Sequence, residues 1–184
     1  MPFDHFDFIA PIYNRVDSYS ALDTMLEIGD FPVMGYLLDV GGGTGRVANA
    51  LREKAARIVI ADVSMGMLRF AASRPGLQTV AAYSEHLPFP DACFERIIMV
   101  DALHHVVDQE CTSRELLRLL KPGGRIIIEE PDIHTFGVKL IALAERILWM
   151  RSHFLAPQQI ASLFPLAKSG IKTKGSSAWI VIRK

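Results

Sequence analysis

The chain has 184 residues, of which 50% are hydrophobic and 22% charged, and its 20 basic residues balance 20 acidic ones. This length suffices for one domain with its own core, and the neutral charge gives no basic surface for a nucleic acid. There is no apolar run of the ~18 residues that a spanning helix needs, no signal-peptide pattern, and only two cysteines, Cys93 and Cys111, which we expect to be reduced thiols. These features predict a single-domain cytoplasmic protein, residues 1–184, without stable membrane insertion.

The predicted elements alternate between strands and helices after a helical N-terminal region. Residues 1–34 are expected to form a cap of one or two helices over the carboxyl edge of a sheet. In residues 35–184, short β-branched runs alternate with helical patterns, which is typical of a parallel sheet with helices on both faces. The predicted strands are Tyr36–Val40, Ile58–Asp62, Thr79–Ala82, Arg96–Val100, Arg125–Glu129, Gly170–Lys174 and Ala178–Ile182. The predicted helices are roughly Gly45–Lys54, Met65–Ser73, Cys111–Leu120 and Gly137–His153.

The last two predicted strands are joined by a very short connection around "KGSS". A parallel crossover needs a much longer segment, so these strands must pair antiparallel as a hairpin. The sequence therefore predicts a three-layer, Rossmann-like α/β fold. Its seven-stranded sheet is mostly parallel, and the last strand is antiparallel.

The stretch "LLDVGGGTGRVA" joins the first predicted strand to the first core helix through a glycine-rich loop. The dinucleotide-binding fingerprint G-x-G-x-x-G/A fails here, because Arg46 stands at its third required position. The pattern that fits is acid-x-G-x-G-x-G, formed by Asp39, Gly41, Gly43 and Gly45. Glycines allow positive φ and let the backbone approach a ligand without an intervening Cβ. A tight turn without a ligand is the alternative interpretation of this loop.

Two acids indicate which nucleotide such a loop would hold. A dinucleotide brings a pyrophosphate, which favours free N–H groups and a helix N-terminus, and Asp39 would repel it. A ligand with an ammonium and a sulfonium group would instead be attracted by that acid. Asp62, at the end of the second predicted strand, is placed to accept hydrogen bonds from ribose hydroxyls, which would suit either ligand. The loop therefore favours S-adenosylmethionine.

Four further segments resemble those of one enzyme class, in the right order along the chain. They are "FDFIAPIYNRV" (residues 6–16), "EHLPFPDACFERIIM" (85–99), "ALHHV" (102–106) and "LLRLLKPGGRIIIEE" (116–130). With the glycine loop, they make the chain resemble the class I S-adenosylmethionine-dependent methyltransferases. Within that class, it is similar to the branch of the ubiquinone/menaquinone biosynthesis C-methyltransferases.

The resemblance implies a role for several residues. The backbone around Gly41 and Gly43 would face the methionine part of the cofactor, with Asp39 near its ammonium and Asp62 on the ribose. The adenine would be met by Val63, Met67, Ser84 and Glu85. Two positions depart from the family pattern: Tyr83 stands where an adenine-binding Asp is common, and Asn14 stands where an Asp usually follows the N-terminal tyrosine.

The segment "DALHHV" follows the fourth predicted strand, so its polar residues should lie at the ligand edge of the sheet. His104 is a candidate general base, or would orient a substrate oxygen; capping a turn and packing are the structural alternatives for both histidines. Adjacent histidines rarely share one ion, so we expect no metal site with Asp101 or Asp108. Glu130, or its neighbour Glu129, would line the pocket, cap a helix or lie at the surface.

The stretch 137–154 is apolar around much of its circumference. It would form a lid over an apolar substrate, contact a membrane surface, or pack in the core and at a homodimer contact. Together these features predict a methyltransferase that acts in line on a small apolar or aromatic molecule, at carbon or oxygen. The alternative is a non-catalytic regulatory or partner protein that binds S-adenosylmethionine.

Overall fold

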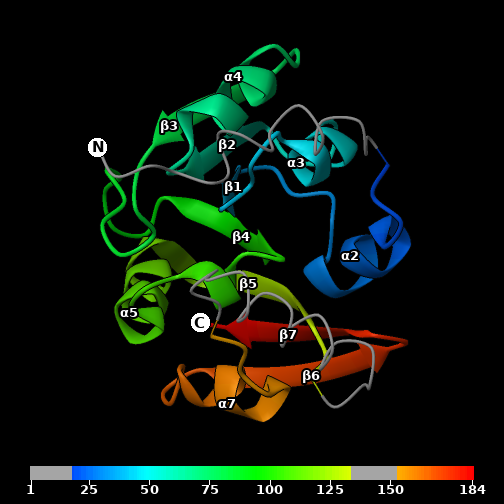
Figure 1. Ribbon diagram of the computed structural model, residues 1–184, viewed down its shortest axis with the longest axis vertical. Helices are drawn as coiled ribbons and strands as arrows, with labels where there is room; N and C mark the ends of the chain where they lie inside the picture. The colour runs from blue at the N-terminus through cyan, green and yellow to red at the C-terminus, as the bar shows by residue number, and fades with distance from the viewer. Residues whose placement is uncertain (1–17, 134–152) are drawn as a thin grey trace, which may run out of the picture.

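The computed structural model describes residues 18–133 and 153–184. Its sheet has the strand order β3-β2-β1-β4-β5-β7-β6, which Figure 1 shows edge to edge. The strands are β1 (Tyr36–Val40), β2 (Arg57–Asp62), β3 (Leu77–Ala81), β4 (Phe94–Val100), β5 (Leu120–Pro131), β6 (Lys168–Lys174) and β7 (Ser177–Arg183). The first five pair in parallel, whereas β7 is antiparallel to both of its neighbours. The predicted fold class, with one reversed strand near the end of the chain, is confirmed.

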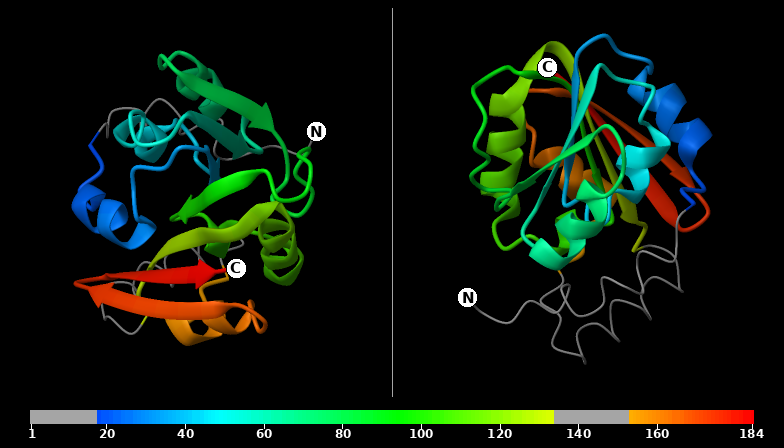
Figure 2. Two further views of the ribbon diagram at one scale, coloured as in Figure 1. Left: turned by 180° about the vertical axis from the view of Figure 1, so that it is seen from behind. Right: turned by 90° about the horizontal axis from the view of Figure 1, so that it is seen from above.

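Helices cover both faces of this sheet. The described helices are α2 (Leu22–Gly29), α3 (Arg46–Ala50), α4 (Met65–Ala72), the 3₁₀ turn η1 (Leu103–His105), α5 (Gln109–Leu119) and α7 (Pro157–Ser162). Successive residues of β1 face opposite sides of the sheet: Leu37 packs in a cluster with α2, α3 and α4, and Leu38 in a second cluster with α5 and α7. Both are fully buried, as expected for a central strand of a parallel sheet. The right-hand view of Figure 2 shows the sheet between these two helix layers.

The boundaries of most elements lie within a few residues of the prediction, and β5 differs most. It begins at Leu120 rather than at Arg125, because "LKPGG" is a bulge within the strand and not a turn before it. Phe94 of β4 pairs with Leu120, and the next pair is Arg96 with Arg125. The intervening residues 121–124 have no strand-pairing partner on β4, and Gly123 takes a positive φ of 77°. The extra residues of a bulge bend the strand without ending it.

Two helices also differ from their predicted ranges. The helix predicted over Gly45–Lys54 ends at Ala50, and α5 begins at Gln109, because the carboxylate of Asp108 accepts the Cys111 N–H at 2.8 Å and caps it. The helix α7 was not predicted. The predicted helix Gly137–His153 lies outside the described residues except for His153, which is not helical.

The described part of the N-terminal cap, α2, lies on a face of the sheet and not over its carboxyl edge as predicted. Its Met25 is fully buried in the same cluster as Leu37. The carbonyl groups at its end accept hydrogen bonds from Arg96, near the start of β4, and from Arg125, which follows the bulge of β5. Burial of its apolar stripe and capping of its last carbonyls therefore fix α2 along the sheet.

No helix among the residues that the structure describes is both long and apolar enough to cross a membrane.

Candidate functional site

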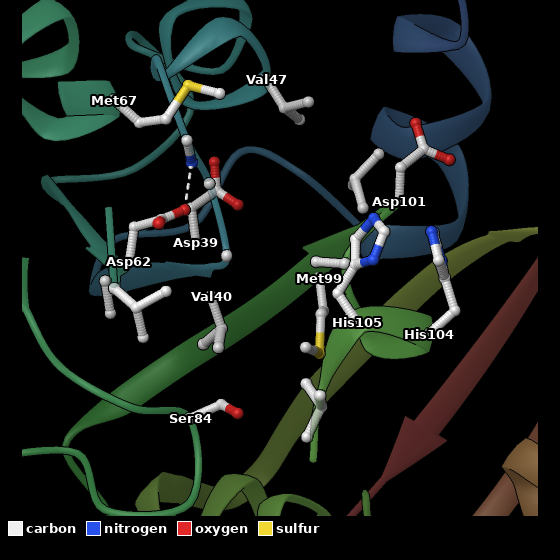
Figure 3. Close-up of a pocket in the computed structure, with 18 of the residues that line it drawn as sticks. Asp39, Val40, Val47, Asp62, Met67, Ser84, Met99, Asp101, His104 and His105 are labelled. Atoms are coloured by element: carbon white, nitrogen blue, oxygen red, sulfur yellow. Dashed lines mark hydrogen bonds between the residues drawn. The ribbon is translucent and has the colours of Figure 1, made fainter. Parts of the chain in front are cut away.

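A cavity of about 480 Å³ opens at the carboxyl ends of β1, β2 and β4. In an α/β sheet, ligands bind at this edge, where the strand order reverses on either side of the first strand. Nine of the ten predicted site residues line it: Asp39, Gly41, Gly43, Asp62, Val63, Met67, Ser84, Glu85 and His104. Figure 3 shows Asp39 and Asp62 on one side of the cavity, and His104 and His105 on the other. We call these the glycine-loop wall (residues 39–45 and Asp62) and the histidine wall (residues 101–105 and Glu130).

The glycines of the glycine-loop wall have distinct roles. Gly41, Gly43 and Gly45 all take positive φ angles, of 68°, 55° and 77°, where side chains other than glycine are strained. A Cβ on Gly41 would lie 2.6 Å from the Cβ of Ala102, whereas one on Gly43 would meet nothing closer than the Met67 sulfur at 3.9 Å. Gly45 does not line the cavity, because it caps α3 and packs against β2.

Asp62 holds the glycine loop in place. Its Oδ2 accepts the Gly43 N–H and its Oδ1 accepts the Ser64 N–H, each at 2.8 Å. Each carboxylate oxygen has two lone pairs and can accept more than one hydrogen bond. Asp62 therefore couples the end of β2 to the loop after β1.

Asp39 is a buried acid with an orphaned oxygen. The residue is 1% exposed, and its Oδ2 has no hydrogen-bond partner among the described residues. Burial, and then the charge of Asp62, raises the pKa of Asp39 to about 7, although an N–H of Ala48 and the charge of Arg46 oppose the shift. A buried carboxylate without full compensation is costly, so this position favours a ligand that brings a cation.

Ser84 and Glu85 form the side of the cavity that follows β3. The Ser84 hydroxyl lies 2.9 Å from that of Thr112, and Glu85 accepts the Asp108 N–H at 3.2 Å. Both residues are thus tied to the start of α5. Tyr83, at the position where the family pattern departs, is 64% exposed and lines the same cavity.

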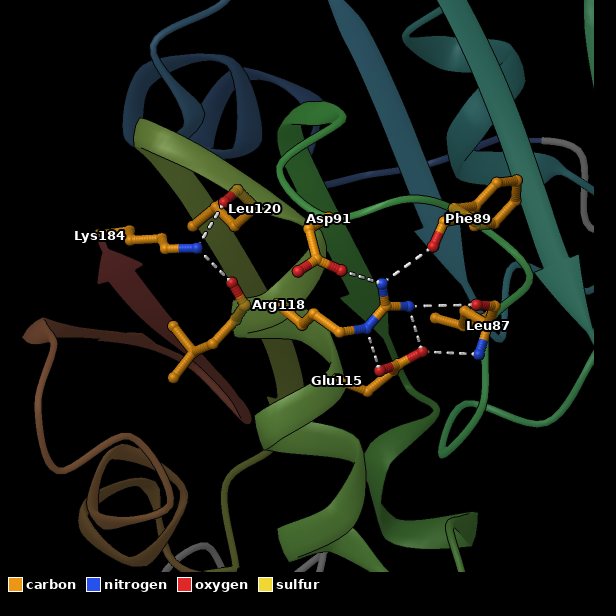
Figure 4. A network of polar contacts seen from close by, with 8 residues as sticks. Leu87, Phe89, Asp91, Glu115, Arg118, Leu120 and Lys184 are labelled. Carbon is orange, nitrogen blue, oxygen red and sulfur yellow. Dashed lines mark hydrogen bonds and ion pairs between the residues drawn. The ribbon is translucent and has the colours of Figure 1, made fainter.

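The adjoining loop, which contains "LPFPD", is clasped by one arginine of α5 (Figure 4). Arg118 donates to the carbonyls of Leu87 and Phe89 and to the Asp91 carboxylate, the last at 2.6 Å. It also donates two hydrogen bonds to the Glu115 carboxylate. The bonds to Glu115, and then the bond to Asp91, raise the pKa of the Arg118 guanidinium. The motif therefore fixes the loop against α5 and supports the cavity side formed by its preceding residues.

On the histidine wall, Glu130 organises the turn that carries both histidines. Its Oε1 accepts the N–H groups of Ala102 and Leu103 at 3.0 and 2.7 Å, and its Oε2 lies 2.5 Å from Nδ1 of His104. The His104 ring stacks on Phe154 with centroids 4.3 Å apart. Of the roles expected for the acids at the end of β5, Glu130 therefore has that of a helix cap, at η1. Its side chain is 4% exposed and lies behind the cavity.

Three residues at the junction of the two walls were not predicted as a group. Arg46 lines the cavity 3.8 Å from the Asp101 carboxylate and 5.6 Å from the centre of the Tyr19 ring. Asp101 has a positive φ of 52°, a strained conformation of the kind that clusters at functional sites. Arg46 could have been found as the residue after the glycine loop. Tyr19, whose hydroxyl donates to Glu129, carries no such signal.

Among the described residues, no group of three His, Cys, Asp or Glu side chains could hold a metal ion.

Comparison with known proteins gives the class of this chain. A family model described as a methyltransferase domain matches residues 38–128. The demethylmenaquinone methyltransferases of Thermobifida fusca and Clavibacter sepedonicus are 38% and 35% identical over 51% and 66% of the chain. The ubiquinone/menaquinone biosynthesis C-methyltransferase of Pseudomonas putida is 35% identical over 51% of it. The chain covers only 42%, 57% and 41% of these relatives, in that order.

Solved structures share the fold. The YcgJ protein of Bacillus subtilis superposes with a TM-score of 0.75 at 21% identity, covering 83% of this chain and 70% of that one. A methyltransferase of Aquifex aeolicus superposes with a TM-score of 0.72 at 16% identity, covering 98% of both chains. The methyltransferase-domain model over residues 38–128 and the curated relatives define the class: the chain belongs to the class I S-adenosylmethionine-dependent methyltransferases. Within it, the chain is similar to the ubiquinone/menaquinone C-methyltransferase branch.

The cavity fits S-adenosylmethionine, the cofactor of this class. Its volume lies in the range of about 300–1,000 Å³ usual for small-molecule sites. The buried and incompletely compensated Asp39 carboxyl group in the lining would attract an ammonium, and Gly43 leaves open the space that a Cβ would fill. A pyrophosphate would instead meet two carboxylates, Asp39 and Asp62, at the same loop.

Proposed function

We propose that this protein transfers the methyl group of S-adenosylmethionine to a carbon or oxygen atom of a small apolar or aromatic acceptor. The observation that carries the proposal is the buried, incompletely compensated carboxyl group of Asp39, which follows the same strand as the glycine loop and belongs to the lining of a cavity that the histidine wall also lines. The names of the relatives, which act on demethylmenaquinone or in ubiquinone and menaquinone biosynthesis, favour a quinone-type acceptor.

The glycine-loop wall would hold the cofactor. In this proposal Asp39 binds the ammonium, the backbone of Gly41 and Gly43 faces the methionine part, and Asp62 accepts from the ribose hydroxyls. The adenine is met by Val63, Met67, Ser84 and Glu85, while Gly45 shapes the loop. The cofactor supplies a methyl group already activated on a sulfonium, so the protein has no leaving group to create.

The rest of the cavity would hold the acceptor. Val40, Met99, Val106 and Phe154 give it apolar walls, which suit a flat ring and exclude water. Positioning two reactants in line can contribute about 7–11 kcal/mol, whereas a general base supplies roughly 10²–10⁴-fold. We therefore assign the main part of the catalysis to the shape of the cavity and a smaller part to the histidine wall.

Two measurements test this proposal. Isothermal titration with S-adenosylhomocysteine should show binding to the wild type, and the same titration of Asp39→Asn should show a loss of about tenfold or more. Radiolabelled methyl transfer to reduced 1,4-naphthoquinone and to a cell extract should place the label in the organic phase. Binding without transfer to any acceptor would support the non-catalytic alternative, and absence of binding would refute both.

A further inference from the structure

Among the described residues that line the cavity, Arg46 is the one side chain with a permanent positive charge. The same lining carries four carboxyl groups, those of Asp39, Asp62, Glu85 and Asp101. An arginine guanidinium stays protonated in proteins, whereas a histidine changes its charge near neutral pH. Arg46 is therefore the lining residue that best suits an anionic group of a ligand.

The contacts that the described residues give to the Arg46 guanidinium are long. It donates to the Ser18 carbonyl at 3.5 Å and lies 3.8 Å from the Asp101 carboxylate. Arg118, by comparison, contacts the carboxylates of Asp91 and Glu115 at 2.6–2.8 Å. Because a guanidinium has five N–H donors, the two long contacts of Arg46 occupy few of them.

Arg46 also lies near the acid that we assign to the cofactor ammonium. Asp39 precedes the glycine loop, and Arg46 follows it as the first residue of α3. The charge of Arg46 opposes the rise in the pKa of Asp39 that burial, and then the charge of Asp62, cause, so the two groups lie within electrostatic range. In Figure 3, Asp101 lies on the side of the two histidines, apart from Asp39. Arg46 thus connects the glycine loop with the histidine wall.

Groups from two other segments support the position of the Arg46 side chain. Its guanidinium carbon lies 5.6 Å from the centre of the Tyr19 ring, a distance typical of a cation–π contact. The Tyr19 hydroxyl donates to Glu129, which fixes the ring in turn, and Asp101 supplies the ion pair. The Arg46 side chain is 28% exposed, so salt and water screen its charge less than they screen that of a surface arginine.

We propose that Arg46 binds the carboxylate of the methionine part of S-adenosylmethionine, and that it makes the cavity select this cofactor over cationic analogues without a carboxylate. The ammonium and the carboxylate are attached to the same carbon, so the residues that bind them must lie close together, as Asp39 and Arg46 do at the two ends of one loop. Without a cation there, Asp39 would repel the carboxylate. This inference rests on the proposed function and assigns a further group of the same cofactor site.

Binding of three ligands tests the assignment without turnover. S-adenosylmethionine carries both charged groups of the amino-acid part, its decarboxylated form lacks the carboxylate, and 5′-methylthioadenosine lacks the whole amino-acid part and the sulfonium charge. In calorimetric titrations, the wild type should bind S-adenosylmethionine at least about tenfold more tightly than the decarboxylated form, as expected for a charge-assisted hydrogen bond. A wild type that binds the two alike, or that prefers the decarboxylated form, would overturn the proposal.

Two substitutions of Arg46 give opposite expectations. Arg46→Met should abolish the preference for S-adenosylmethionine or reverse it, because the four carboxyl groups of the lining favour the more cationic ligand. Arg46→Lys keeps the charge and should retain part of the preference. The affinity for 5′-methylthioadenosine should stay within about threefold of the wild-type value in both variants. If Arg46→Met weakened binding of 5′-methylthioadenosine as much as that of S-adenosylmethionine, the role of Arg46 would be structural and the assignment wrong.

Asp101→Asn separates binding of the carboxylate from the ion pair that joins the two walls. Asparagine tolerates a positive φ such as the 52° of this position, and the variant removes the partner charge while Arg46 stays in place. The preference for S-adenosylmethionine should persist or increase, because a competing acid is lost. Its loss in Asp101→Asn, as complete as in Arg46→Met, would contradict the proposal. Arg114→Met, at a side chain that is 68% exposed, controls for the loss of one positive charge and should leave all three affinities unchanged.

Arginine ¹⁵Nε spectra provide a second readout. Addition of S-adenosylmethionine should shift the Nε signal of Arg46 more than addition of its decarboxylated form does, and equal shifts would contradict the proposal. The two hypotheses fail in different ways. A wild type that binds none of the three ligands refutes both, whereas binding of S-adenosylmethionine without a preference for its carboxylate refutes the role of Arg46 and leaves the proposed function standing.

Discussion

The glycine-loop wall and the histidine wall face one cavity but are built in different ways. Most of the first comes from one strand, one loop and one helix start within a short stretch of chain, and Asp62 adds two hydrogen bonds from the adjacent strand. The second depends on Glu130, which lies 26 residues beyond His104 in the sequence and reaches it because β4 and β5 pair in parallel.

This difference shows where specificity can change without loss of the cofactor. A wall made by local backbone geometry tolerates few side chains, because three of its glycines take positive φ angles. In the histidine wall, the side chains of the short turn can be substituted while the Glu130 carboxylate still holds the backbone of that turn. The four predictions below, from the largest expected effect to the smallest, test this contrast.

Gly41→Ala should have the largest effect. Its Cβ would lie 2.6 Å from that of Ala102 in a positive-φ conformation, so the loop must shift. We expect affinity for S-adenosylhomocysteine to fall by about a hundredfold or more, and the free energy of unfolding to fall by about 3 kcal/mol, as measured by calorimetry and urea titration. The control is Gly175→Ala, which also has a positive φ but meets nothing within 4 Å. It should cost about 1–2 kcal/mol and leave binding unchanged; equal effects of both variants would contradict the role given to Gly41.

Asp39→Asn should weaken cofactor binding and stabilise the free protein. Since burial raises the pKa of Asp39 from 3.8 to about 7, its ionisation progressively destabilises the fold between these values and does so fully above them. Above pH 7 the variant should therefore be more stable by about 1–3 kcal/mol, and the gain should shrink toward pH 4. Thermal unfolding at several pH values measures this.

The matched variant, Asp62→Asn, should instead lose affinity and stability together, because it disturbs bonds to two backbone N–H groups. If both variants lowered stability alike at pH 8, the buried charge of Asp39 would not be the controlling feature of the glycine-loop wall.

Glu130→Gln should weaken the histidine wall alone. The Glu130 carboxylate accepts two backbone N–H groups with one oxygen and contacts Nδ1 of His104 with the other. A neutral amide cannot replace all of these contacts with equal strength, so the free energy of unfolding should fall by about 2 kcal/mol. Affinity for S-adenosylhomocysteine should change by less than about threefold, that is by less than about 0.65 kcal/mol. Glu110→Gln, whose side chain is 78% exposed, is the control and should cost under about 0.5 kcal/mol. A large loss of cofactor affinity in Glu130→Gln would mean that the two walls are not independent.

Arg118→Ala should have the smallest effect, of about 1–2 kcal/mol on unfolding, because its side chain is 33% exposed. The clasped loop should loosen, with a change in cofactor affinity of less than about tenfold. The comparison is Arg114→Ala, whose side chain is 68% exposed with one ion pair at 3.9 Å; it should be nearly neutral. Equal stability of the two variants would show that the clasp contributes nothing.

Local patterns were enough to predict the strand alternation, the reversed β7 and the acid–glycine loop. Hydrophobic runs and glycine positions act through backbone conformation and burial, which neighbouring residues largely decide. The bulge in β5 was missed because "LKPGG" has the composition of a turn, and only pairing with β4 makes it part of a strand. The prediction that the N-terminal cap covers the carboxyl edge of the sheet was wrong for α2. The position of this helix depends on hydrogen bonds from Arg96 and Arg125, which lie far along the chain.

The amino-acid order alone thus specified the fold class, the class of cofactor and nine of the residues that line the cavity, since these follow from short-range periodicity and loop chemistry. Tertiary structure decided how deeply each of those residues is buried and which groups it contacts. It buried Asp39 with an unpartnered oxygen and joined Glu130 to His104 while His105 remained at the surface of the cavity. Burial and charge pairing are properties of groups that folding brings together, and no local sequence pattern encodes them.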